Sequence, residues 1–152
     1  MDNLRFIEEI NKISDENKIK IFDSTEIYQI EPIQTVLINS DFDIYSEVNR
    51  EILHRLIVDR GYYSSYEPCT YPGVNIKYMY NNLYDKCGIC KCDCNCNGKG
   101  EGLGIGDCKR VTIAVFNSGK IIITGGKSKE QLIESYNFIT NVLSDRKKFI
   151  IK

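Results

Sequence analysis

The spacing of apolar residues changes several times along this 152-residue chain, and each change marks an expected element. A helical spacing of apolar side chains predicts a short N-terminal helix, built on Leu4, Ile7, Ile10 and Ile13. Two stretches, 18–22 and 26–30, alternate with period two and predict a hairpin or two edge strands. After Pro32 breaks the chain, residues 35–39 predict a further strand.

The next region predicts a helix over about residues 44–59. Its apolar positions recur at helical spacing: Ile44, Val48, Ile52 and Leu56. Gly61 marks its end, and three polar residues before it are candidate N-caps, namely Ser40, Asp41 and Asp43. Alternation then predicts strands over 74–80, 111–116 and 120–124, with a turn at 117–119 between the last two.

The clearest helix comes last. Ser128 and Gln131 form a capping box, and an apolar stripe follows at Leu132, Ile133, Tyr136, Ile139, Val142 and Leu143. The order of elements over 35–145 predicts an α+β fold, a curved antiparallel sheet with two helices on one face. The other face is then free and must be polar, paired or used for binding. We expect residues 1–34 to form an extension and 35–152 the main domain, with a Cys/Gly-rich insertion at about 84–109.

Charge is close to balanced overall but uneven along the chain. The formal net charge is −1, yet residues 109–152 carry nine Lys/Arg against three Asp/Glu. This basic third is compatible with phosphate contact or with an ordinary solvated helix face. The chain has no run of eighteen apolar residues and no signal-peptide core, so we expect an intracellular protein. Its single histidine, His54, gives no catalytic triad, and we expect no enzyme.

Two motifs lie about 45 residues apart. The first is Ser64-Ser65-Tyr66-Glu67-Pro68 running into Tyr71-Pro72-Gly73, and the second is Phe116-Asn117-Ser118-Gly119-Lys120 running into Thr124-Gly125-Gly126-Lys127. Together, in this order and between matching elements, they resemble the TATA-box-binding protein family. Residues 35–145 are similar to one repeat of that family, most of all to its second repeat.

The resemblance implies a DNA-contacting set on the free face of the sheet. Tyr71 and Phe116 stand where the family wedges aromatic rings between base steps, which kinks AT-rich double-stranded DNA through its minor groove. The remaining implied contacts are Thr35 and Leu37 on the first strand, Ile122 and Thr124 at the groove floor, and Ser118, Lys120 and Lys127 near phosphates. Thr35 replaces a family asparagine, and Cys69 and Thr70 replace residues that dock an initiation factor.

One repeat makes half of the family's saddle, and its open sheet edge predicts pairing. The partner is a second copy or another TBP-like subunit, unless residues 18–30 cover the edge and leave a monomer. The leading hypothesis is a transcription-initiation-type factor that acts as a paired half-saddle, with initiation factors as further partners. The alternatives are a protein-interaction module that has lost DNA binding and an accessory domain that delivers nucleic acid to a separate enzyme. An AT-biased composition favours a large DNA virus as the source, with the nucleus, cytoplasm, virus factory or virion as the location.

Six cysteines fall within 22 residues: Cys87, Cys90, Cys92, Cys94, Cys96 and Cys108. In an intracellular protein this density favours metal over disulfides. The Cys-x-x-Cys spacing of Cys87 and Cys90 lets both thiolates reach one tetrahedral zinc, and Cys108 is the natural closing ligand. A structural zinc is therefore predicted. A loop of free or oxidised thiols and a multi-metal or iron–sulfur cluster are the alternatives.

Overall fold

The computed structural model describes residues 3–17, 34–83, 86–92, 96, 98–102 and 104–151. The chain divides into two units, Met1–Gln34 and Thr35–Lys152. Within the first unit, helix α1 (Asn3–Asn17) confirms the predicted N-terminal helix. The amide of Asn17 donates to the carbonyl of Ile13 at 2.8 Å in its last turn. The predicted strands at 18–22 and 26–30 lie outside the described residues.

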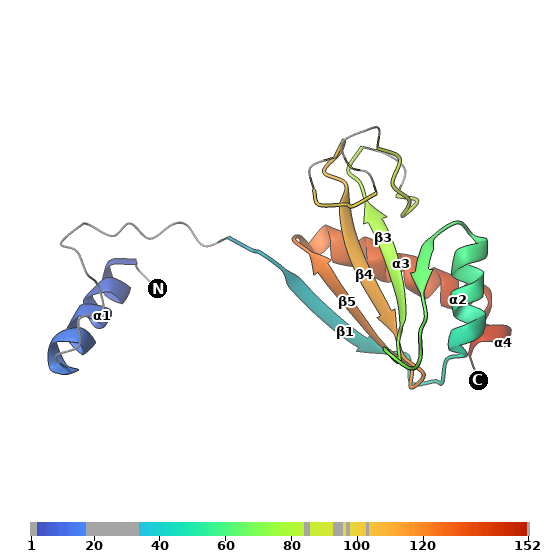
Figure 1. The fold of residues 1–152 in the computed structure, drawn as a ribbon, viewed down its shortest axis with the longest axis horizontal. Coiled ribbons are helices and arrows are strands. Elements are labelled where there is room, and N and C mark those ends of the chain that lie inside the picture. Colours follow the sequence, from blue (N-terminus) through green and yellow to red (C-terminus); the bar gives the residue numbers. More distant parts are fainter. Residues whose placement is uncertain are drawn as a thin grey trace. The chain divides into compact units, whose positions relative to one another are not determined.

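The second unit is a five-stranded antiparallel sheet with helices on one face (Figure 1). Its strands are β1 (Ile38–Asp43), β2 (Tyr63–Ser65), β3 (Val74–Tyr80), β4 (Lys109–Val115) and β5 (Lys120–Gly126), in the order β1-β5-β4-β3-β2. The helices are α2 (Arg50–Asp59), α3 (Lys129–Asp145) and the short α4 (Lys147–Ile150). This architecture confirms the predicted fold class. Strand β2 and helix α4 were not predicted.

The core lies between the sheet and the helices, and the alternation of strand β3 shows this most clearly. On β3, Val74, Ile76 and Tyr78 are buried, whereas the residues between them are only half-buried. Helices α2 and α3 add buried side chains from the other side, among them Leu53, Ile57, Ile139 and Leu143. Period two in the strands and a helical stripe above them therefore build one apolar layer. Among the described residues, no helix has the length and apolar character needed to cross a membrane.

The start of the second unit differs from the prediction at two places. The first strand covers 38–43 rather than 35–39, because β5 ends at Gly126, the partner of Ile38, and no described strand lies beside 35–37. The helix predicted from residue 44 begins at Arg50. Asp41 and Asp43 pair with residues of β5 instead of capping helix α2. The N-cap of α2 is Asn49, whose side-chain oxygen accepts from the Ile52 amide at 3.2 Å.

The two helix ends that the sequence marked are present. Gly61 has φ +82°, the left-handed conformation that follows a helix C-terminus. At the start of α3, the Ser128 hydroxyl accepts from the Gln131 amide N–H at 3.4 Å. The Gln131 side chain accepts in turn from the Lys127 N–H at 2.7 Å, one residue before the usual capping-box donor.

Candidate nucleic-acid interface and cysteine cluster

The sheet face turned away from the helices is named here the open face. Strand register places three rows of residues side by side on it: Asn75 with Ala114 and Ile122, Lys77 with Thr112 and Thr124, and Met79 with Arg110. Small and β-branched side chains form most of its floor, with hydroxyls and cations around them. Such a floor suits a minor groove, where contacts are shallow and mostly apolar.

An aromatic pair lies at one end of the open face. Tyr71 precedes β3 and Phe116 follows β4, and their ring centroids are 5.8 Å apart at a tilt of 58°. Val74 and Val115 pair directly, so the antiparallel register brings the two rings to the same end of the sheet. This ring pair joins residues that the sequence separates by 45 positions, as the resemblance implied.

The ring pair rests on a glycine. A Cβ added to Gly73 would lie 2.8 Å from Cε1 of Tyr71 and 3.2 Å from Cε1 of Phe116. The segment before it is fixed by a turn in which the Tyr71 amide donates to the carbonyl of Glu67 at 2.9 Å. Arg50 of α2 adds a hydrogen bond to the Pro72 carbonyl. Gly73 is therefore required for space rather than for a special backbone conformation.

The two lysines predicted to contact phosphates, Lys120 and Lys127, differ in whether a carboxylate lies beside them. Lys120 Nζ lies 3.1 Å from a carboxylate oxygen of Asp41 on β1, so its charge is partly neutralised. Lys127 is exposed beside the start of α3. The hydroxyl of Ser118 instead accepts from the Lys120 amide at 3.4 Å inside the hairpin turn.

The two residues predicted on the first strand, Thr35 and Leu37, are not part of the strands that form the open face. Thr35 and Leu37 precede β1 and are exposed, with Leu37 half open to solvent at 50%. Thr124 is on the open face as predicted, and its hydroxyl donates to the side-chain carbonyl of Asn39. Asn39 is therefore a polar residue, not singled out from the sequence, that the structure places beside Thr124.

Two further cations on the open face were missed by the sequence reasoning. Lys77 donates to the hydroxyl of Thr112 at 3.0 Å, and its neighbour Arg110 lies one row further along. Burial lowers the pKa of Lys77, and the charge of Arg110 lowers it further. Within the described residues neither side chain has a carboxylate partner. The sequence did indicate the position of Lys77, because it lies between the apolar residues of an alternating strand and therefore faces away from the core.

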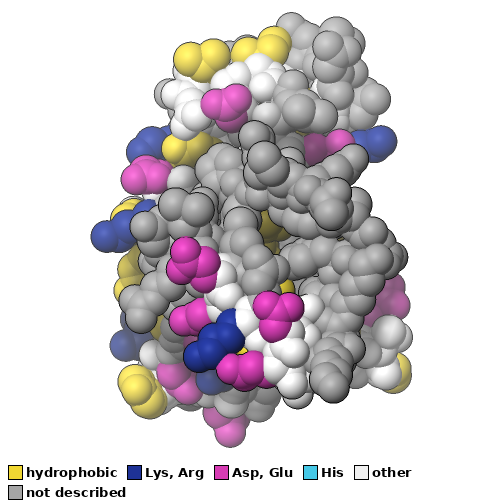
Figure 2. Space-filling view, turned by 90° about the vertical axis from the view of Figure 1, so that its left-hand side faces the viewer, with side chains coloured by type: hydrophobic (Ala, Val, Ile, Leu, Met, Phe, Trp, Pro, Cys, Tyr) yellow, Lys and Arg dark blue, Asp and Glu magenta, His cyan; other side chains and the backbone are white. Residues whose placement is uncertain are grey.

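Charge elsewhere is mixed. Acidic and basic side chains are interspersed among the described residues visible in Figure 2, which shows no extended patch of one sign there. With a net charge of −1, long-range attraction to DNA is weak. Any phosphate contact must therefore come from local cations such as Lys77 and Arg110.

Four thiols meet at the opposite end of β3 and β4 from the ring pair. The sulfurs of Cys90, Cys92, Cys96 and Cys108, named here the cysteine cluster, all lie within 4.8 Å of one another. The distances are 3.6 Å from Cys90 to Cys96 and 3.8 Å from Cys90 to Cys108. Tetrahedral zinc with Zn–S bonds of about 2.3 Å separates its sulfurs by about 3.8 Å, so this donor set fits a structural zinc.

Of the two other predicted ligands, Cys87 lies outside the cluster and Cys94 is not among the described residues. The Cys87 thiol points to the carbonyl of Ile89 at 3.7 Å instead of the four sulfurs. Among the described thiols, Cys90 therefore has Cys92 rather than Cys87 as its near neighbour along the chain in the cluster. Cys94 lies outside the described residues, and Cys69 is exposed and apart from the others.

A buried asparagine and two glycines shape the loop around the thiols. Asn81 is 6% exposed, donates to the Ile105 carbonyl and lies 3.9 Å from the Cys92 sulfur. A Cβ on Gly106 would come within 2.1 Å of the Asn81 side-chain oxygen, and one on Gly104 within 3.0 Å of the Cys92 sulfur. Sequence reasoning missed Asn81, which no spacing rule singles out.

The thiols of the cluster differ in acidity. Burial raises the pKa of Cys108, and hydrogen bonds from its own thiol to neighbouring sulfurs raise it further. Burial also raises the pKa of Cys90, but hydrogen bonds from the Cys92 amide and nearby thiols outweigh it, so the pKa of Cys90 is lowered. Cys90 therefore becomes the thiolate, the form that a metal binds, more readily than Cys108.

His54, the remaining candidate for chemistry, joins two elements. Its Nδ1 lies 2.9 Å from the Ser64 hydroxyl, which ties α2 to β2, and its ring faces Tyr66 at 6.3 Å. No carboxylate among the described residues is hydrogen-bonded to this histidine. His54 and Ser64 therefore have a structural role, which is to join helix α2 to strand β2.

Comparison with known proteins identifies the fold at family level. The family described as "Transcription factor TFIID (or TATA-binding protein, TBP)" matches residues 47–146, from just before α2 to just after α3. The chain belongs to the TATA-box-binding protein family. The family is one of transcription factors rather than enzymes, and the predicted resemblance is confirmed.

A TATA-box-binding protein family relative comes from a virus. It is a "TATA-box-binding protein-like" protein of Acanthamoeba polyphaga mimivirus, 30% identical over 149 residues. The match covers 89% of this chain and 30% of the viral protein, so the chain spans less than a third of that relative.

Proposed function

We propose that this protein binds the minor groove of AT-rich double-stranded DNA as a transcription-initiation-type factor. The observation that carries the proposal is the ring pair of Tyr71 and Phe116 at one end of the open face, which no described helix of the second unit covers. An aromatic wedge unstacks a base step at a cost of a few kcal/mol, which contact over the bent site offsets. AT-rich steps lack the guanine amino group in the minor groove, so they fit a floor of apolar and small side chains such as Ile122 and Ala114.

Residues 35–152 act in this proposal as one half of a saddle that pairs along β1. The outer side of β1 has no neighbouring strand among the described residues, so its backbone groups are available to a second sheet. The partner is a second copy or another TBP-like subunit, and residues 1–34 form an appended extension. Sedimentation equilibrium at micromolar concentration tests self-pairing, and the mass of a single chain both with and without DNA would exclude it.

A FRET bending titration tests DNA binding directly. End-labelled AT-rich and GC-rich duplexes are mixed with the protein at low and physiological salt. Bending confined to the AT-rich duplex and second order in protein supports the paired half-saddle. Phe116→Ala is expected to abolish bending but to keep the fold, because Phe116 is only half-buried and outside the core, and an aromatic pair contributes about 1 kcal/mol.

Phe149→Ala is the matched control for the aromatic truncation, since Phe149 is 63% exposed and lies on the helix side of the sheet, opposite the open face. Equal loss of bending in both variants would contradict the wedge role. Normal bending by Phe116→Ala would do the same. Absence of bending by the wild-type protein at every concentration would favour the alternative, a TBP-fold module that binds only proteins.

We further propose that the cysteine cluster holds one structural zinc that closes the loop between β3 and β4. A four-thiolate site is closed, so the metal supplies cross-linking and no catalysis. Elemental analysis of protein purified under reducing conditions is expected to give one zinc per chain. Less than about half a zinc per chain would remove this assignment.

Single cysteine variants test which thiols bind the metal. Cys108→Ser is expected to lose the zinc because its sulfur is fully buried among the other three. Cys87→Ser and Cys69→Ser are the matched controls and are expected to keep it, since neither sulfur is in the group. Zinc loss in Cys87→Ser would restore the Cys87–Cys90 knuckle that the spacing predicted.

A further inference from the structure

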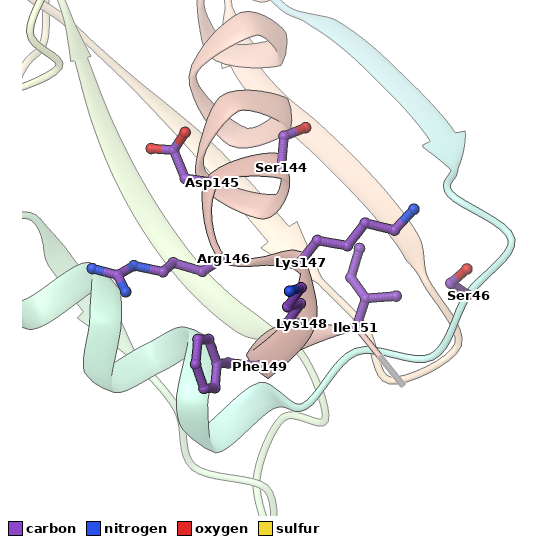
Figure 3. A pocket seen from close by; sticks show the side chains of 8 residues that line it. All are labelled: Ser46, Ser144, Asp145, Arg146, Lys147, Lys148, Phe149 and Ile151. Carbon is purple, nitrogen blue, oxygen red and sulfur yellow. The ribbon is translucent and has the colours of Figure 1, made fainter.

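Two hollows adjoin on the helix side of the sheet, and they share Arg146 and Phe149. The first, of about 640 Å³, lies where α3 meets α4 and is drawn in Figure 3. The second, of about 350 Å³, is bounded by α2. Together they form one surface, named here the α2–α4 groove, on the opposite side of the sheet from the open face.

The aromatic ring in this groove is held at the surface by its neighbours. Ile150 is fully buried, and its carbonyl accepts from the Asn49 amide at 2.7 Å. Ile151 forms a β-bridge with Val48 next to it. Because the backbone is fixed on this side, Phe149 points outward and remains 63% exposed. The exposed ring adds apolar area to the groove, and contiguous exposed apolar area is typical of interaction sites.

Helix α2 contributes one row of side chains to the same groove. Ile52, Arg55, Leu56 and Asp59 line the second hollow at helical spacing, and Ile52 is 37% exposed. The floor is therefore apolar, formed by Ile52, Leu56 and Phe149. Its length and one-sided apolar character suit the face of a helix laid between α2 and α4.

Positive charge surrounds this floor. Arg55, Arg146, Lys147 and Lys148 line the two hollows against two carboxylates, Asp59 and Asp145. Asp145 already pairs with Arg60 at 3.4 Å. Among the described residues, none of the four lining cations has an ion-pair partner. The groove thus offers cations to an incoming ligand without first breaking an ion pair.

We propose that the α2–α4 groove binds an acidic amphipathic helix of a partner protein. Apolar side chains of that helix cover Phe149 and Ile52, and its carboxylates face Arg146 and the two lysines of α4. Complementary charge sets the orientation and the association rate, while the apolar contact supplies most of the affinity. An apolar floor disfavours nucleic acid as the occupant, since phosphates placed on it would lose water without gaining a hydrogen-bond donor from Phe149, Ile52 or Leu56. Because the groove and the open face lie on opposite sides of the sheet, both are available at once.

Fluorescence anisotropy with a labelled peptide tests the proposal on the full chain. The probe is an 18-residue peptide of Leu, Phe and Glu with its apolar residues on one helical face. Micromolar binding is expected, weakened about tenfold by Phe149→Ala and by Lys148→Glu, which corresponds to a loss typical of an interface anchor. Circular dichroism and the unfolding midpoint verify that both variants fold.

Two matched controls separate the groove from general surface properties. Lys129→Glu makes the same charge change at the other end of α3, and Tyr63→Ala removes an aromatic that is 64% exposed on β2, away from the groove. Both are expected to bind the probe like the wild type. Equal weakening by a control variant would overturn the assignment of the site.

Three other results would overturn the proposal. The first is the absence of binding up to millimolar peptide. The second is equal affinity for a scrambled peptide of the same composition, which would show attraction by charge alone. The third is loss of duplex DNA binding in Lys148→Glu without any peptide binding, which would make the groove a nucleic-acid contact.

Discussion

Replacing Asp41 by asparagine is expected to strengthen DNA binding and to make it more sensitive to salt. In the folded protein the Asp41 carboxylate lies 3.1 Å from Lys120 Nζ, at the edge of the proposed DNA-binding face. Lys120 is one of the two lysines, with Lys127, that the family resemblance implies near phosphates. With Asp41 neutral, Lys120 is free to neutralise one additional phosphate.

The magnitude follows from counterion release. Each phosphate neutralised by a protein cation steepens the dependence of log K on log salt by about 0.9. Lowering the salt concentration from about 0.2 M to about 0.05 M should therefore increase the affinity of the variant about 3.5-fold more than that of the wild type. Folding stability should change little, because both side chains are more than half exposed, at 53% and 59%, and such pairs contribute about 0–1 kcal/mol.

The assay is a salt titration of affinity for an AT-rich duplex by fluorescence anisotropy. Asp59→Asn serves as the control, since it makes the same change in net charge on α2, behind the sheet. The control should keep the wild-type slope. An unchanged slope in Asp41→Asn, or the same steepening in both variants, would refute a phosphate contact by Lys120.

Three other substitutions test the fold that supports these sites. Ile139→Ala, at a fully buried position of α3, should lower the free energy of unfolding by about 2–5 kcal/mol in urea denaturation, and a loss under about 1 kcal/mol would contradict its place in the core. Gly119→Ala should cost about 1–3 kcal/mol and displace the turn after Phe116, because φ is +91° and the new Cβ would lie 2.3 Å from the Ser46 carbonyl oxygen; an unchanged midpoint would argue against this turn. Burial, and then nearby acidic groups, raise the pKa of Tyr78 to about 12, so the folded protein binds more protons than the unfolded chain above pH 10. The free energy of unfolding should therefore fall from about pH 10 to pH 12 in the wild type and fall less in Tyr78→Phe, and equal slopes would contradict the shift.

Much of the fold was accessible from local patterns. Strand β3 and the helix that starts after Ser128 were predicted with nearly correct bounds, because alternation and the capping box are local signals. Helix α2 was placed too early, since Asp41 and Asp43 are equally good as N-caps and as polar residues of an edge strand. The choice between these roles is made by the long-range pairing of β1 with β5.

The site divides in the same way. The motifs around Tyr71 and Phe116 were visible in the sequence, and so was the density of cysteines. The sequence did not show that Lys120 faces an acid, that Lys77 and Arg110 are neighbours, or that Cys87 turns away from the other thiols. These facts depend on strand register and loop closure, which join residues far apart along the chain.

The sequence by itself therefore determined the family, the order of elements and the residue types available for DNA and metal. Tertiary structure alone decided which of them meet. Register fixed the ring pair and the rows of the open face, and the loop between β3 and β4 selected four of the cysteines as neighbours. The physical reason is that periodicity and capping act within a few residues, whereas contact between distant side chains is set by the packing of the whole sheet and its helices.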